Sequence, residues 1–139
     1  MLRLSILAAL AALAACTTRP DQDHAPTCST MAACNEADGK RVHVVGVYTV
    51  YDSMSVRPKD MPPPRQVELR LGGQDGPFLG ETGSDDFLRP LDEIARLRGK
   101  RVRVTGTFRT TPPPDSDNDS RGGPFIYPHI HPIERIDLE

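Results

Sequence analysis

Aromatic residues are scarce in this chain of 139 residues, which contains no tryptophan, three tyrosines and four phenylalanines. Proteins that bind single-stranded nucleic acid usually stack the bases on aromatic rings, so this scarcity argues against such a role. The formal net charge is −2, and a mildly acidic protein has no general attraction for a phosphate backbone. We therefore expect no nucleic-acid partner.

Recognisable catalytic motifs are also missing. The sequence contains no G-x-S-x-G, H-E-x-x-H or P-loop pattern. Asp85 and Asp86 adjoin, but consecutive residues of an extended chain point to opposite sides and make a poor acid–base pair. Cys28 and Cys34 do not form a C-x-x-C redox pair. An enzyme is therefore the least favoured class, and we expect no cofactor.

The one long apolar run lies at the N-terminus. Arg3 supplies a positive charge, residues 4–13 are apolar except for one serine, and two alanines lead into Cys16. This layout is typical of an export signal, and the run is too short to span a bilayer comfortably. The alternative is an ordinary signal peptide in which the position of Cys16 is incidental.

The residues Leu13-Ala14-Ala15-Cys16 resemble the lipobox of bacterial lipoproteins. The resemblance implies that residues 1–15 are a signal peptide and that the thiol of Cys16 carries an acyl chain such as palmitate. Several acyl chains together hold a protein firmly on a membrane. In the Gram-negative members of this family an aspartate after the cysteine favours the inner membrane. This chain has Thr17 there, which implies a location at the outer membrane, facing the periplasm.

Removing the leader leaves 139 − 15 = 124 residues and a formal charge of 16 − 19 = −3, which suits one acidic domain. Cys28 and Cys34 then remain as a pair, and the oxidising periplasm favours a disulfide between them. In a straight helix, residues six apart lie about 10 Å from each other, whereas a disulfide needs less than about 7 Å. The pair can bond only if residues 28–34 turn or break; two free thiols are the alternative.

The remaining chain divides at Gly39. Residues 16–38 contain the lipidated cysteine, a polar tether with two prolines, and a short cysteine-containing segment with one possible helical turn. Beyond Gly39, residues 39–48 and 99–108 share the pattern G-K-R-V-x-V-x-G-x-aromatic. Alternating β-branched residues predict strands whose Val, Val, Gly and aromatic positions face inward. A glycine there permits a bend or a close backbone approach, as in small barrels.

Other segments complete a predicted order of strand, strand, strand, helix, strand, strand. We expect strands at 67–71, 77–80 and 133–138, a turn at 72–76 and a helix at 90–98. This order resembles the OB-fold. The resemblance implies that residues 39–139 form a mainly β, five-stranded Greek-key barrel, with its one helix between strands three and four. A small open β-sandwich or roll is the alternative.

Two long loops, residues 52–66 and 110–125, join strands one to two and four to five. They contain the proline runs Pro62–Pro64 and Pro112–Pro114, which are stiff and extended. In OB-folds these loops flank the usual ligand face. They are either semi-rigid rims of a binding groove or tolerated surface insertions.

His129 and His131 form an H-x-H pair, which places both imidazoles on one side of an extended segment. Neutral imidazole binds copper, zinc or nickel, and Met54 and Met61 of the facing loop could add thioether ligands. This set is similar to that of small periplasmic copper-binding OB-fold proteins, which use His and Met as ligands. In those proteins a tryptophan lies beside the metal, and this chain has no tryptophan. Two partly exposed structural histidines are the alternative.

Two charged groups are weaker candidates. Residues 115–119 carry oxygen ligands at alternate positions, but Ser120 and Ile126 stand where a calcium loop needs glycine and glutamate. Five arginines lie on or beside predicted strands, and they form either a stripe for an anion or a solvated face paired with acids such as Glu68. These arginines are Arg65, Arg70, Arg101, Arg103 and Arg109.

Together these patterns predict a lipid-anchored, non-catalytic binding module of the cell envelope. Its partners would be the membrane, through the lipid on Cys16, and a protein, glycan or small anion held between the two proline loops. A metal-binding protein that uses His129 and His131 is the first alternative, and an unrecognised enzyme is the second.

Overall fold

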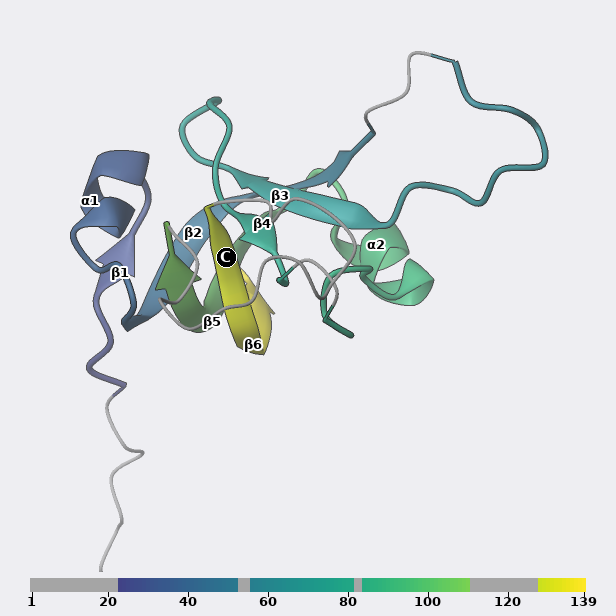
Figure 1. Ribbon diagram of the computed structural model, residues 1–139. Coiled ribbons are helices and arrows are strands. Elements are labelled where there is room, and N and C mark those ends of the chain that lie inside the picture. Colours follow the sequence, from purple (N-terminus) through teal and green to yellow (C-terminus); the bar gives the residue numbers. More distant parts are fainter. Residues whose placement is uncertain (1–22, 53–55, 82–83, 111–127) are drawn as a thin grey trace, which may run out of the picture.

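The computed structural model describes residues 23–52, 56–81, 84–110 and 128–139 (Figure 1). The predicted signal peptide and Cys16 lie outside these ranges. The elements in chain order are β1 (Thr27–Cys28), α1 (Met31–Asn35), β2 (Arg41–Tyr51), β3 (Gln66–Arg70), β4 (Phe78–Leu79), α2 (Leu91–Leu97), β5 (Arg101–Arg109) and β6 (His129–Leu138). Among the described residues, no helix is long and apolar enough to cross a bilayer.

Strands β2 to β6 close into a barrel of five strands. The hydrogen-bonded order is β2-β3-β4-β6-β5, and β5 pairs again with β2 to complete the ring. The β4–β6 pair is parallel and the other pairs of the ring are antiparallel. Helix α2 lies between β4 and β5, the third and fourth strands of the ring. The predicted mainly β, OB-like barrel is therefore confirmed.

The repeated sequence explains the centre of this barrel. The two copies are antiparallel neighbours with Val44 opposite Val104, which is the middle of both repeats. The hydrogen bonds at the two ends of the β2–β5 ladder are therefore related by a local two-fold symmetry. Gly39 N–H donates to Phe108 O at 2.7 Å, and Gly99 N–H donates to Tyr48 O at 2.8 Å. Each glycine has a positive φ and joins a short helix to its strand.

The inward alternation predicted for both copies is also confirmed. The valines and aromatic residues at those positions are fully buried: Val42, Val44, Tyr48, Val102, Val104 and Phe108. A Cβ on Gly46 would lie 2.8 Å from the carbonyl oxygen of Arg70, and one on Gly106 would lie 2.5 Å from that of Pro132. The mid-strand glycines therefore serve the close backbone approach that their position predicts.

The N-terminal segment packs onto the barrel earlier than the predicted boundary at Gly39. Strand β1 pairs in parallel with His43 and Val44 of β2, and Cys28 forms a disulfide with Cys34 of α1. Their Cα atoms are 5.3 Å apart, because the chain leaves β1 and turns before α1 begins. Both cysteines are buried in the core cluster. The flexible tether predicted over residues 17–27 is therefore wrong for its last five residues, 23–27, which dock on the barrel.

The last strand also differs from its prediction. It begins at His129 rather than at Ile133, because His129 pairs with Arg109 and Ile130 with Phe108. Prolines 128 and 132 flank these residues, and proline normally argues against a strand. The H-x-H pair is therefore part of the barrel wall.

Candidate functional site

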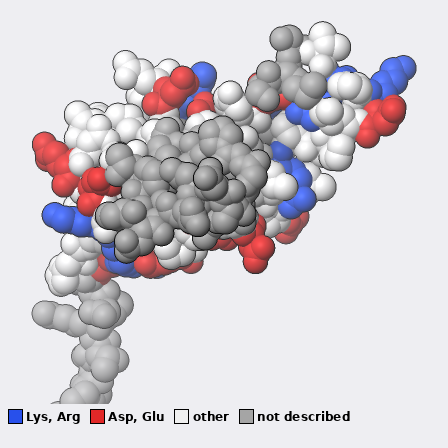
Figure 2. All heavy atoms as spheres, viewed as in Figure 1, with Lys and Arg blue, Asp and Glu red and all other residues white. Residues whose placement is uncertain are grey.

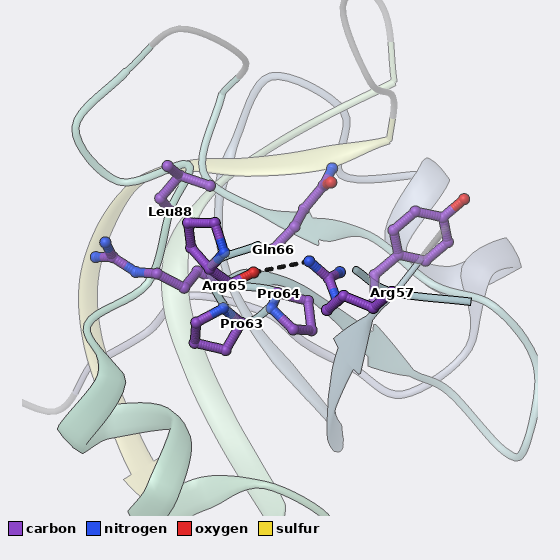
Figure 3. Close-up of a pocket in the computed structure, with 8 residues that line it drawn as sticks. Arg57, Pro63, Pro64, Arg65, Gln66 and Leu88 are labelled. Carbon is purple, nitrogen blue, oxygen red and sulfur yellow. Dashed lines mark hydrogen bonds between the residues drawn. The ribbon is translucent and has the colours of Figure 1, made fainter. Parts of the chain in front are cut away.

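A pocket of about 380 Å³ opens beneath the β2–β3 loop (Figure 3). The described residues that line it are Tyr51, Arg57, Pro62, Pro63, Pro64, Arg65, Gln66 and Leu88. Its volume falls in the range of small-molecule sites, which are mostly apolar with a few polar groups. The first proline run therefore forms one wall of a pocket, and whether this wall binds a ligand stays a prediction. The second run, Pro112–Pro114, lies outside the described residues.

Arg57 holds the proline wall in place. Its Nη1 donates to the carbonyl oxygen of Pro62 at 2.7 Å, and its Nη2 donates to Asp52 Oδ1 at 2.8 Å. The ion pair with Asp52 offsets the charge of this arginine within the loop itself. The proline run is stiff by its own geometry, so a few such bonds suffice to keep the pocket open.

The opposite wall is fastened by a reciprocal pair of bonds. Arg89 N–H donates to the carbonyl oxygen of Arg65 at 2.9 Å, and Arg65 Nε donates back to the carbonyl oxygen of Arg89 at 2.8 Å. These bonds tie the segment before α2 to the start of β3 and so position Leu88, which remains half-exposed at the pocket. Both walls are thus fixed before any ligand arrives.

Arg65 is the pocket cation without an acidic partner. Within the described part of the chain no carboxylate lies within 4 Å of its guanidinium, whereas Arg57 is paired with Asp52. The two arginines lie on opposite sides of the proline run (Figure 3). The terminal nitrogens of Arg65 therefore carry a positive charge that no described carboxylate balances within 4 Å.

Gln66 adds a side-chain amide beside the pocket. Its Nε2 atom is buried and has no hydrogen-bond partner among the described residues. Gln66 is the cross-strand partner of Tyr51, whose ring meets the Phe78 ring edge-on at a centroid distance of 5.3 Å. A buried donor without an acceptor costs about 1–3 kcal/mol, so such a group calls for a specific explanation.

The two histidines predicted as metal ligands lie in unlike surroundings. Ile130 between them packs in the core, so both imidazoles lie on the other face of β6. His129 is buried, whereas the His131 side chain is 28% exposed and lies 3.4 Å from Asp86 and 3.8 Å from Glu81. Among the described residues no three His, Cys, Asp or Glu side chains are arranged to hold a metal ion.

The other residues of the predicted metal and calcium sites are only partly placed. Met61 is 40% exposed on the β2–β3 loop. Met54 and residues 115–119 lie outside the described residues. Asp85 and Asp86 are described, and Asp86 contacts His131 and Arg89 from the segment before α2.

The strand arginines do not form one stripe. Arg70 lies 3.6 Å from Glu68 and 3.4 Å from Asp75, and Arg103 pairs with Glu139 at 2.7 Å. Burial raises the pKa of Glu68. On the face that Figure 2 shows, basic and acidic side chains are intermixed. A solvated face whose arginines pair with nearby acids is therefore the better description, although Glu68 lies on the same strand as Arg70 and not across from it. Arg65 differs because it lines the pocket.

Two networks of side chains were not predicted. In the first, Arg89 donates two hydrogen bonds of 2.8 Å to Glu93, and Tyr48 Oη donates to the same carboxylate at 2.8 Å. Burial raises the pKa of Glu93, but the bonds from Arg89 and Tyr48 outweigh it and leave the pKa lowered. Burial, together with the Glu93 charge, raises the pKa of Tyr48. This network fastens α2 beside the pocket.

The second network docks the N-terminal segment. Asp23 pairs with Arg41 and lies 3.2 Å from His43 Nε2, while His43 Nδ1 is 2.8 Å from Thr105 Oγ1. The hydrogen bond from Arg41 lowers the pKa of Asp23. An Asp–His–Thr series resembles a hydrolase triad, but Thr105 is only 1% exposed and cannot meet a substrate. The arrangement serves attachment, and no short-range sequence pattern joins residues so far apart.

Comparisons with protein-family models, curated proteins and solved structures give no match to this chain.

Proposed function

We propose that this chain is a lipid-anchored, non-catalytic binding module of a bacterial cell envelope, and that its ligand occupies the pocket beneath the β2–β3 loop. One observation carries the proposal: the loop that flanks the ligand face of an OB-type barrel here frames a preformed pocket, and the Arg65 guanidinium at this pocket has no carboxylate partner among the described residues. The lining is mostly apolar with few polar groups, as is usual for small-molecule sites.

The chemistry of the lining supports binding rather than catalysis. Among the described lining residues there is no carboxylate, imidazole, thiol or aliphatic hydroxyl. Those are the groups that usually act as nucleophile or general base. The arginines donate hydrogen bonds, and the prolines and Leu88 offer apolar surface. Such a set recognises a ligand but does not easily transform it.

The proposal of a lipid anchor rests on the sequence of residues 1–16, which resembles an export signal that ends in a lipobox. The disulfide of the barrel supports an oxidising compartment outside the cytoplasm. The acylated thiol of Cys16 would hold the domain at the periplasmic face of the outer membrane.

Two measurements test this function. The first is metabolic labelling with an alkyne palmitate analogue, which should mark the wild-type chain in membranes and fail to mark Cys16→Ser. An equally labelled Cys16→Ser chain would refute the anchor.

The second measurement places a photo-crosslinking amino acid in the full chain within intact envelopes. At position 88, in the pocket, it should capture a ligand that the same group at Leu138, 55% exposed on β6, does not capture. Equal yields at positions 88 and 138 would show that the pocket is not the binding surface.

A further inference from the structure

Strand β6 has an open edge along its C-terminal half. Among the described residues, β6 pairs with β5 from Ile133 onward on one side, and on the other side β4 pairs with its first two residues. The N–H of Glu139 donates to the carbonyl oxygen of Arg101 and continues the β5–β6 ladder. Backbone groups alternate along an antiparallel ladder, so those of Ile136 and Leu138 face away from β5. Such an edge is a template for pairing with another strand.

The inward side chains along this edge are less covered than those of the neighbouring strand. Ile136 lies opposite Val104 in the ladder, yet Val104 is fully buried and Ile136 only partly buried. Leu138 lies opposite the fully buried Val102 and is exposed. A further strand at the open edge would therefore cover apolar surface as well as satisfy backbone groups.

The outward side chains of the edge carry opposite charges two residues apart. Arg135 and Asp137 lie on this outer face, and Arg135 Nε is 2.6 Å from Asp137 Oδ2 within the chain. Two copies that pair antiparallel about Ile136 would place Arg135 of each copy opposite Asp137 of the other. Opposite charges directly across a strand pair are favourable, whereas like charges are unfavourable.

The charge pattern also selects this register over its neighbours. A pairing centred one residue earlier would oppose the two copies of Arg135, and one centred one residue later would oppose the two copies of Asp137. The pairing centred on Ile136 avoids both conflicts. It also brings Leu138 of each copy diagonally against Ile136 of the other, on the apolar face.

We propose that the open edge of β6 binds the same edge of a second copy of this chain, which gives a two-fold dimer with its strands antiparallel about Ile136. A surface that is complementary to itself in this way is what a two-fold interface requires. The dimer involves no residue of the pocket lining, so it stands or falls independently of the proposed ligand.

The first test follows association and edge protection together. The full chain is purified in detergent, and sedimentation is measured over a concentration series that detects dissociation constants up to the millimolar range. Amide hydrogen exchange is followed by NMR in the same samples. The amides of Ile136 and Leu138 should exchange more slowly as the dimer fraction rises, whereas that of Asp137, which faces β5, should be slow throughout.

Two outcomes of this test overturn the proposal. One is a chain that remains monomeric over the whole series with rapidly exchanging amides at Ile136 and Leu138. The other is a monomer in which these amides are already protected, which would show that another segment of the same chain occupies the edge.

Charge variants test the register. Arg135→Asp and Asp137→Arg should each raise the dissociation constant of the dimer about tenfold or more, because two opposed pairs change from opposite to like charge. An equal mixture of the two variants should associate again, since the acidic pair of one chain then faces the basic pair of the other. Asp75→Arg, which makes the same charge change at an exposed position between β3 and β4, should associate as the wild type does.

Thermal melting of each variant controls for folding. Folded single variants that associate like the wild type, or a mixture that associates no better than either variant alone, would refute the pairing of Arg135 with Asp137.

The crosslinking experiment in intact envelopes reads the dimer apart from the ligand. Position 138 lies on the proposed edge, so its adduct with a second copy has twice the mass of the chain and is counted separately from ligand capture at position 88. Asp137→Arg should reduce this self-adduct and leave the capture at position 88 unchanged. A self-adduct of undiminished yield in Asp137→Arg would contradict the dimer, while the proposed function would stand.

Discussion

The two copies of the repeat share a backbone frame but are fastened by different chemistry. In each, a short helix passes through a glycine of positive φ into a strand, and the amide hydrogen bonds at the two ends correspond. Helix α1 is attached by a disulfide in an apolar setting, whereas α2 is attached by a buried ion pair with a tyrosine hydroxyl. The same frame thus tolerates a covalent or an ionic attachment.

The two copies end in different aromatic residues, and this difference matches the way in which the neighbouring helix is attached. Tyr48 lies at the α2 end of the ladder and gives its hydroxyl hydrogen to Glu93. Phe108 lies at the α1 end, where the first turn of the helix contains no acidic residue. The hydroxyl is therefore present only where a carboxylate receives it, because a buried hydroxyl without a partner is costly.

Removing the ionic attachment should have the largest effect. Glu93→Ala leaves the Arg89 guanidinium buried without its main partner, and breaking such a pair costs about 3 kcal/mol or more in unfolding free energy. Urea denaturation measures the loss. Asp92→Ala, at an exposed position of the same helix turn, is the matched control and should change stability little. Equal losses in the two variants would show that the ion pair does not fasten α2.

Removing the covalent attachment should cost somewhat less. Replacing Cys28 and Cys34 together by alanine opens a short loop, for which the chain-entropy relation gives about 2 kcal/mol. The same denaturation experiment applies. Dithiothreitol should destabilise the wild type by a similar amount and leave the double variant unchanged. A reducing agent that affects both chains alike would contradict the assignment of the effect to this bond.

Exchanging the aromatic residues should lower the stability by a smaller amount, through the loss of a hydroxyl at one end and the gain of a hydroxyl at the other. Tyr48→Phe removes one hydrogen bond to Glu93 and should cost about 1 kcal/mol. Phe108→Tyr adds a hydroxyl at a fully buried position and should also destabilise the protein, although tyrosine is the residue at the equivalent position of the other copy. Melting temperatures of the two single variants measure both effects. A stabilising Phe108→Tyr would show that the two ends are interchangeable.

The smallest expected effect is the change with pH in the contribution of Glu93 to the free energy of unfolding. The folded-state pKa of Glu93 is lowered, so its contribution is present above the unfolded-state value of about 4.5 and disappears as the pH falls through the folded-state value. The stability difference between wild type and Glu93→Gln should thus be greatest near neutral pH and shrink below about pH 4.5. Denaturation at several pH values measures it, and a difference independent of pH would contradict the argument.

The sequence predicted the elements that local patterns encode. Alternating valines and mid-strand glycines located β2 and β5, and proline and glycine bounded α2. Strand β1 was missed because two residues are too few to show a period, and the start of β6 was hidden by its prolines.

The site was predictable only in outline. The first proline loop indicated a rim, but the properties of Arg65 and Gln66 depend on which partners they lack, and that depends on the whole fold. The same holds for Glu93, which meets Tyr48 across 45 positions of sequence. Spacing along the chain carries no signal for such contacts.

The docking of Asp23 also sets how far the barrel can stand from a bilayer. If Cys16 carries the lipid, 23 − 16 = 7 residues remain as a leash, and even fully extended they span at most about 25 Å. Asp23 pairs with Arg41 at the start of β2, and the pocket adjoins Tyr51 at the end of the same strand. From Arg41 to Tyr51 there are ten residue steps, which span about 33 Å in an extended strand. The leash is thus shorter than the strand. The barrel would then stay close to the lipid headgroups at its docked end, and the pocket lies at the other end of β2.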